Sequence, residues 1–99
     1  MNKPMASNIS TSLIISTYNR SDALELCVKS VLRQSLLPDE IIIADDGSKE
    51  DTRELIHQLA ASSEVPIIHV WHEDLGFRLA SIRNKAIAKA SKEYIIQID

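Results

Sequence analysis

Four short apolar runs recur along the chain, and the first three of them lead into polar residues, while the fourth ends at Asp99. The runs cover residues 13–16, 40–44, 66–71 and 93–99. They are continuous and rich in isoleucine, a pattern that is typical of parallel strands buried on both faces of a sheet. An open parallel sheet binds its ligands just beyond the carboxyl ends of its strands. The polar residues that follow the runs are therefore the first candidates for a functional site.

Three stretches of helical periodicity separate the four runs. Apolar residues recur three to four positions apart within residues 21–35, 50–61 and 78–91. The alternation of strands and helices predicts an α/β fold, and right-handed crossovers then give a four-stranded parallel sheet with helices on both faces. The periodicity leaves the order of the strands open.

Local signals also predict where the helices begin. Ser21 or Asp22 is expected to cap the first helix, and Ser48 with Asp51 resembles a capping box before the second.

Length and composition restrict the class of protein. The 99 residues make one domain at most, with residues 1–11 expected as a disordered lead-in and residues 12–99 as the folded part. The net charge of −3 gives no electrostatic basis for binding nucleic acid or an anionic membrane. No apolar run approaches the roughly 20 residues that span a bilayer. The single cysteine, Cys27, is expected to pack in the core.

Two adjacent aspartates, Asp45 and Asp46, follow the second apolar run. Neighbouring carboxylates repel each other and destabilise the fold unless something uses them. A carboxylate in this loop can accept a hydrogen bond from a ribose hydroxyl or a base imide. A plain Asp-Gly turn before a Ser-capped helix explains the same residues without a ligand. The sequence leaves both interpretations open.

The loop after the first run, Thr17-Tyr18-Asn19-Arg20, contains no glycine. This excludes both the dinucleotide-binding fingerprint and the P-loop, which need glycines where the backbone approaches phosphate. The ring of Tyr18 is suited to stacking on a base. Taken alone, a turn with a half-buried tyrosine and an asparagine cap explains the loop better.

Residues 71–78 place several polar side chains after the third run. Arg78 opens a helix, where a cation is poorly placed relative to the helix dipole and is better explained by a bound phosphate. Arg83 and Lys85 add positive charge, although a solvated helix face explains each of them more simply. Among the histidines, His69 is expected to be structural and His72 stays undecided.

Together, these residues resemble the family-2 glycosyltransferases of the GT-A fold. The similarity covers residues 12–99 and is carried by motifs at residues 12–20, 30–35, 40–48, 76–87 and 94–99. Residues 73–78 are also similar to bacterial polysaccharide polymerases of the chondroitin-synthase type. The resemblance implies the Rossmann-like N-terminal half of a GT-A domain, with strand order 3-2-1-4, so that all four loops meet along one edge of the sheet.

The resemblance further implies a nucleotide-sugar donor, most often a UDP-sugar, and a saccharide acceptor. The first loop would line the base pocket, the paired aspartates would hold the base or ribose, and the arginines would approach the diphosphate. Asp99 falls on the first aspartate of the DxD motif, which contacts the ribose and binds Mn²⁺ or Mg²⁺. The residues implied for the site are Thr17, Tyr18, Asn19, Asp45, Asp46, Arg78, Arg83 and Asp99.

The implied activity is that of a metal-dependent, inverting hexosyl- or N-acetylhexosaminyltransferase. The second DxD aspartate, the acceptor-binding half and the catalytic base are expected beyond Asp99. The chain alone is therefore expected to be inactive, and its exposed last strand is expected to favour self-association. The expected location is the cytoplasm, either free or peripheral to the inner face of the cell membrane.

Two alternatives remain open at this point. One is a non-catalytic nucleotide-binding or regulatory module with a flavodoxin-like sheet. The other is a nucleotidyltransferase, although that class usually has a glycine-rich basic loop after its first strand, and residues 17–22 contain no glycine.

Overall fold

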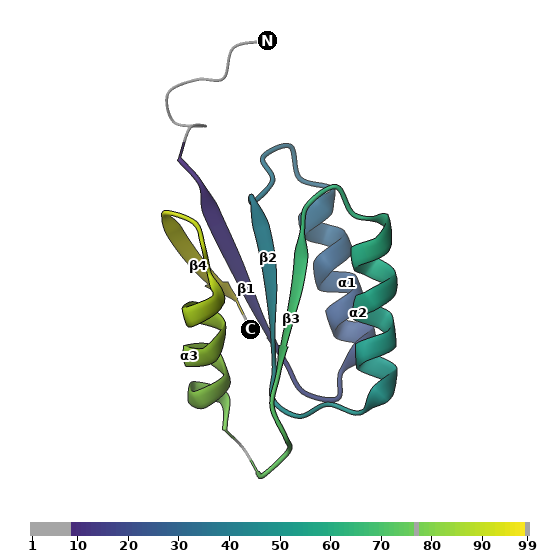
Figure 1. Ribbon diagram of the computed structural model, residues 1–99. Helices are drawn as coiled ribbons and strands as arrows, with labels where there is room; N and C mark the ends of the chain where they lie inside the picture. The colour runs from purple at the N-terminus through teal and green to yellow at the C-terminus, as the bar shows by residue number, and fades with distance from the viewer. Residues whose placement is uncertain (1–8, 77, 99) are drawn as a thin grey trace.

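The computed structural model describes residues 9–76 and 78–98, which form an α/β fold with the element order that the sequence predicts (Figure 1). The elements follow one another as β1 (Thr11–Thr17), α1 (Ser21–Leu32), β2 (Glu40–Asp45), α2 (Glu50–Ser62), β3 (Ile67–Trp71), α3 (Leu79–Lys89) and β4 (Tyr94–Ile98).

Part of the predicted lead-in, residues 1–11, falls within the described part of the chain. Residues 1–8 lie outside the described part of the chain. Thr11 already begins β1, and the carbonyl oxygen of Ser10 accepts a hydrogen bond of 3.0 Å from the backbone N–H of Tyr94. Pairing with β4 therefore draws the end of the predicted lead-in into the sheet.

The four strands of the described sheet are parallel and lie in the order β3-β2-β1-β4. This confirms the predicted order. The chain steps outward from β1 to β2 and β3, and α3 then returns it to the other side of β1. Helices α1 and α2 cover one face of the sheet and α3 covers the other (Figure 1). The order of the strands reverses between β1 and β4, and such a switch point is where open α/β sheets bind ligands.

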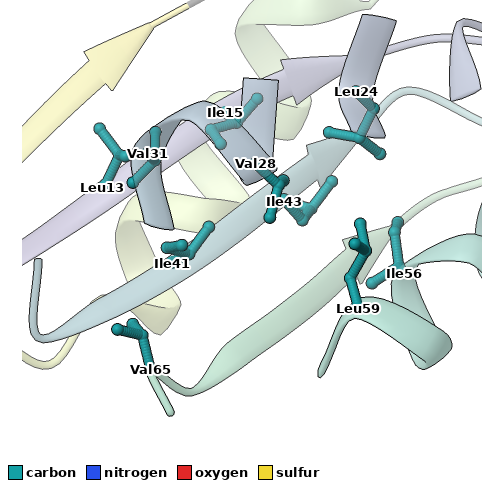
Figure 2. Close-up of a cluster of buried hydrophobic side chains, with 10 residues drawn as sticks. All are labelled: Leu13, Ile15, Leu24, Val28, Val31, Ile41, Ile43, Ile56, Leu59 and Val65. Carbon is teal, nitrogen blue, oxygen red and sulfur yellow. The ribbon is translucent and has the colours of Figure 1, made fainter. Parts of the chain in front are cut away.

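Alternate residues of β1 and β2 divide the core between the two faces. Toward α1 and α2 lies a cluster of buried side chains (Figure 2), formed by Leu13, Ile15, Leu24, Val28, Val31, Ile41, Ile43, Ile56, Leu59 and Val65. Toward α3 lies a smaller cluster of Ile14, Ile42, Ala44, Ile82 and Ala86. Cys27 packs against the larger cluster, as predicted.

The predicted burial of all four strands on both faces is correct for β1 and β2, only partly correct for the half-buried β3, and wrong for β4. Tyr94, Ile95 and Ile96 of β4 are exposed. The reason is helix placement. Helix α3 packs on β2, β1 and β3, and β4 has no comparable helix contact within the described residues.

Neither predicted cap is formed. Helix α1 has Arg20 at its N-cap position and α2 has Lys49, and neither residue makes a side-chain capping hydrogen bond. The hydroxyl of Ser48 instead accepts a hydrogen bond from the backbone N–H of Asn19, which belongs to another loop. Contacts between loops have replaced the local caps.

A buried glutamate ties together three segments at the amino end of the sheet. Glu40 Oε2 accepts hydrogen bonds from Ser12 Oγ at 2.6 Å and from the Ser91 backbone N–H at 2.8 Å, and Oε1 accepts one from Ser91 Oγ at 3.0 Å. Burial by itself raises the pKa of Glu40, but these hydrogen bonds outweigh it and the pKa is lowered. The carboxylate thus holds the α3–β4 connection against β1 and β2.

The assignment of the core predicts that two isoleucines contribute very different amounts to the free energy of unfolding. Ile42 is fully buried, whereas Ile96 is 50% exposed. We expect Ile42→Ala to lower the free energy of unfolding by about 2–5 kcal/mol, because it leaves a cavity, and Ile96→Ala to lower it much less. Urea denaturation measures both. Equal losses for the two variants would contradict the assignment of the core.

Glu40 predicts part of the dependence of stability on pH. Because its pKa is lowered on folding, its contribution is fully present above the unfolded value of about 4.3 and is lost as the pH falls through the folded value. Denaturation between pH 2 and pH 6 is therefore expected to show a shallower loss of stability for Glu40→Gln than for the wild type. Glu64→Gln, at an exposed glutamate, serves as the control.

Candidate functional site

Three loops meet at the carboxyl end of the sheet. They follow β1, β2 and β3 and comprise residues 18–20, 46–49 and 72–78. A fourth site residue implied by the resemblance, Asp99, lies outside the described residues, as does residue 77.

Gly47 allows the loops after β2 and β3 to touch. Its φ angle of +86° lies in the region that favours glycine. A Cβ atom built on Gly47 would lie 2.5 Å from both the backbone nitrogen and the Cα of Asp74. No side chain fits in that space, so the Asp-Gly turn supports the loop above it.

The loop after β1 is attached to both of the others. Asn19 joins it to the β2–α2 turn, because its backbone N–H donates to Ser48 Oγ at 2.7 Å and its Oδ1 accepts from the Lys49 backbone N–H at 2.9 Å. The Tyr18 hydroxyl donates to Asp74 Oδ2 at 2.7 Å. This hydrogen bond and the nearby carboxylate charge raise the pKa of Tyr18. The Tyr18 ring remains close to half exposed, at 46%.

Asp45 is part of the scaffold of the turn. Its Oδ1 accepts a hydrogen bond from the Ser48 backbone N–H at 2.9 Å, and its Oδ2 lies 2.7 Å from His69 Nε2. Only 1% of Asp45 is exposed. His69 is therefore a structural partner, as the sequence suggested, and ligand contact by Asp45 stays a prediction.

Asp46 connects the end of β2 with the beginning of α3. Its Oδ1 lies 2.5 Å from His72 Nε2, and its Oδ2 accepts a hydrogen bond of 2.9 Å from the Arg78 backbone N–H. Asp46 is 2% exposed. Burial by itself raises the pKa of Asp46, but the contacts from His72 and Arg78 outweigh it and the pKa is lowered. The site is thus arranged around an ionised, buried carboxylate.

The remaining predicted site residues have less direct roles. Thr17 contributes its carbonyl oxygen, which accepts a hydrogen bond of 3.0 Å from the Asp46 backbone N–H. Arg78 Nη2 lies 3.4 Å from Ser81 Oγ. Arg83 lies on α3 and is partly buried. Phosphate contact by either arginine stays a prediction.

Sequence reasoning missed the partners of Asp46. The sequence leaves His72 undecided and favours a solvated helix face for Lys85. Lys85 is indeed exposed, but its Nζ also lies 3.1 Å from His72 Nδ1. The available signal was the spacing of His69 and His72, which places two histidines around the end of a strand beside the paired aspartates.

The described residues contain neither a cluster of metal-ligand side chains nor a membrane-spanning helix. Across residues 9–76 and 78–98, no group of three or more histidine, cysteine, aspartate or glutamate side chains is placed to hold a metal ion. The helices in this part of the chain are too short or too polar to cross a membrane.

Comparison with known proteins decides the family. The sequence pattern of the family described as Glycosyl transferase family 2 matches residues 12–99. The chain belongs to this family. It is 32% identical over 98 residues to a chondroitin synthase from Pasteurella multocida strain Pm70, covering 98% of this chain and 10% of that protein.

Two further relatives show the range of similar proteins. A validoxylamine A glucosyltransferase from Streptomyces hygroscopicus subsp. limoneus is 34% identical over 90 residues, which are 89% of this chain and 19% of the relative. A putative colanic acid biosynthesis glycosyl transferase from Escherichia coli strain K12 is 36% identical over 95 residues, or 96% of this chain and 33% of the relative. The chain thus spans between 10% and 33% of the length of these three relatives.

The close approach of Gly47 to Asp74 predicts that a side chain added at Gly47 destabilises the fold. Gly47→Ala is expected to lower the free energy of unfolding by more than about 1 kcal/mol, because it adds a clash to an unfavourable backbone conformation. Gly76→Ala is the matched control, since Gly76 has a similar φ of +94° but no atom within 4 Å of a built Cβ. Chemical denaturation should show the larger loss for Gly47→Ala. Equal losses of unfolding free energy in the two variants would mean that the close approach of Gly47 to Asp74 does not affect stability.

Proposed function

We propose that this member of glycosyl transferase family 2 binds the nucleotide part of a UDP-sugar at the carboxyl end of its sheet. The observation that carries the proposal is that the loops after β1, β2 and β3 contact one another around the buried carboxylate of Asp46, beside the switch point between β1 and β4. Open α/β sheets bind nucleotides at such a point. Membership of the family supports sugar transfer as the reaction of the protein that carries this chain.

Each loop supplies a different part of the proposed nucleotide site. The half-exposed ring of Tyr18 offers a stacking surface for the base, and its hydroxyl is held by Asp74. Asp46 is the proposed acceptor for an N–H or hydroxyl group of the nucleoside. Because Asp46 is buried, this contact requires a local rearrangement around it. Arg78 and Arg83, at the start and along the length of α3, are proposed to approach the diphosphate.

A divalent cation is the second part of the proposal. Asp99 is the residue proposed to bind Mn²⁺ or Mg²⁺, and a carboxylate oxygen is the kind of ligand that these ions take. Asp99 lies outside the described residues, and the described residues do not form a metal site of their own. We therefore assign no step of the reaction to the metal.

The acceptor is proposed to be a saccharide. Relatives include proteins named chondroitin synthase, hyaluronan synthase and teichuronic acid biosynthesis glycosyltransferase, and these names support a polysaccharide product for the whole protein. The proposed reaction is an inverting transfer of a hexose or N-acetylhexosamine.

Tyr18 provides the test of the nucleotide site. A titration with uridine diphosphate, followed by amide NMR with and without Mn²⁺, is expected to shift signals of Thr17, Tyr18, Asp45 and Asp46. Tyr18→Ala should weaken binding by about 1–3 kcal/mol, the scale of base–aromatic stacking. Tyr18→Phe should retain most of the affinity, because it keeps the ring and loses only the hydrogen bond to Asp74.

Tyr94→Ala is the matched control for this test. Tyr94 is a tyrosine of similar exposure, 52%, at the start of β4 and therefore at the opposite end of the sheet. It should bind uridine diphosphate like the wild type. A folded wild-type chain without any shifts at saturating nucleotide would overturn the proposed function, and unchanged affinity in Tyr18→Ala would overturn the stacking role.

A further inference from the structure

A line of hydrogen bonds runs from helix α3 to the carboxylate of Asp46. Lys85 Nζ lies 3.1 Å from His72 Nδ1, and His72 Nε2 lies 2.5 Å from Asp46 Oδ1. His72 and Asp46 are buried, whereas Lys85 is an exposed residue of α3 whose ammonium reaches His72. The proposed nucleotide site is thus connected to a cation that has no part in nucleotide binding as described above.

The chemistry of the three groups fixes the direction of these hydrogen bonds. An ionised carboxylate only accepts hydrogen bonds, so Nε2 of His72 carries the proton that faces Asp46. A lysine ammonium only donates, so Nδ1 of His72 presents its lone pair to Lys85. The opposite tautomer would place an N–H against the ammonium and a lone pair against the carboxylate. Lys85 and Asp46 therefore select the same tautomer from the two sides of the ring.

Helix α3 contributes twice to the arrangement. Its N-cap residue, Arg78, donates a backbone N–H to Asp46 Oδ2, and Lys85, about two turns further along the same helix, faces His72. The two oxygens of Asp46 thus have separate donors, the ring of His72 and the backbone N–H of Arg78. Helix α3 supplies the second donor directly and contacts the first through Lys85. Each carboxylate oxygen can accept two hydrogen bonds, so Asp46 has the capacity to accept one from a ligand once the local rearrangement described above exposes it.

We propose that His72 and Lys85 are positioning residues of the nucleotide site, with Lys85 selecting the His72 tautomer that orients the Asp46 carboxylate for a nucleoside donor group. This inference rests on the proposed function, because it assumes that a nucleoside binds at Asp46. It adds two residues that act through Asp46 and do not contact the nucleotide themselves.

The first test is the tautomer of His72. Long-range ¹H–¹⁵N NMR spectra of the labelled chain at neutral pH are expected to show a protonated Nε2 and an unprotonated Nδ1. Lys85→Met removes one of the two contacts that select the tautomer and should let the ring carry a proton on Nδ1 to a measurable extent, whereas Lys89→Met, at a lysine in the last turn of the same helix, should retain the wild-type pattern. A protonated Nδ1 in the wild type, or an unchanged pattern in Lys85→Met, would overturn the proposal.

The second test is the affinity for uridine diphosphate. His72→Leu should weaken binding at least about tenfold, the effect of losing one charge-assisted hydrogen bond. His72→Gln places an amide N–H near the position of Nε2 and should bind within about threefold of the wild type, a difference smaller than one such hydrogen bond. Lys85→Met should weaken binding and Lys89→Met should not.

The outcomes separate this inference from the proposed function. A wild-type chain that does not bind uridine diphosphate overturns the proposed function. A wild-type chain that binds, with equal affinity in folded His72→Leu and Lys85→Met, overturns only the positioning roles. If His72→Leu does not fold, the comparisons of His72→Gln with the wild type and of Lys85→Met with Lys89→Met decide the question.

Discussion

The buried charge of Asp46 is the constraint around which the carboxyl end of the sheet is arranged. A carboxylate removed from water costs several kcal/mol unless donors replace the lost hydration. Here the donors are a histidine ring and a backbone N–H, and they come from the end of β3 and the beginning of α3. Satisfying one charge therefore fixes how the third strand and the third helix meet the second strand. A change at either donor would leave the carboxylate incompletely solvated and would disturb all three elements.

Strand β2 has a buried carboxylate at each of its ends. Its middle consists of fully buried isoleucines, and a buried carboxylate lies at each end, Glu40 at the amino end and Asp45 at the carboxyl end. Glu40 gathers hydrogen bonds from β1 and from the α3–β4 connection. The turn that follows β2 adds Asp46 and Gly47. The position of β2 is thus set by apolar packing along its length and by charge at its ends, so the loops of the site rest on the best-buried element of the fold.

The sequence predicted what depends on local pattern and missed what depends on contacts between distant residues. Isoleucine-rich runs and helical periodicity were enough for the element order, while the strand order came from the family resemblance. The predicted cap of α2 failed because the Ser48 hydroxyl accepts its hydrogen bond from Asn19 in another loop. Lys85 looks like an ordinary surface lysine in the sequence, and only the packing of α3 on the sheet brings it to His72. No periodic pattern in the sequence predicts this contact between Lys85 and His72.

The paired aspartates show how tertiary structure resolves a local conflict. Asp45 and Asp46 are adjacent, but Asp45 is the last residue of β2 and Asp46 is the first residue of the turn, so their carboxylates meet different partners. Asp45 lies on the same face of β2 as Ile43, and its carboxylate contacts His69, which pairs with Ile43 in the sheet. Asp46 is turned toward α3, and its carboxylate contacts His72. Each carboxylate has its own histidine, so their mutual repulsion is offset twice. One aspartate therefore holds the turn together, and the other is left as the charge that a nucleotide site at this edge would use.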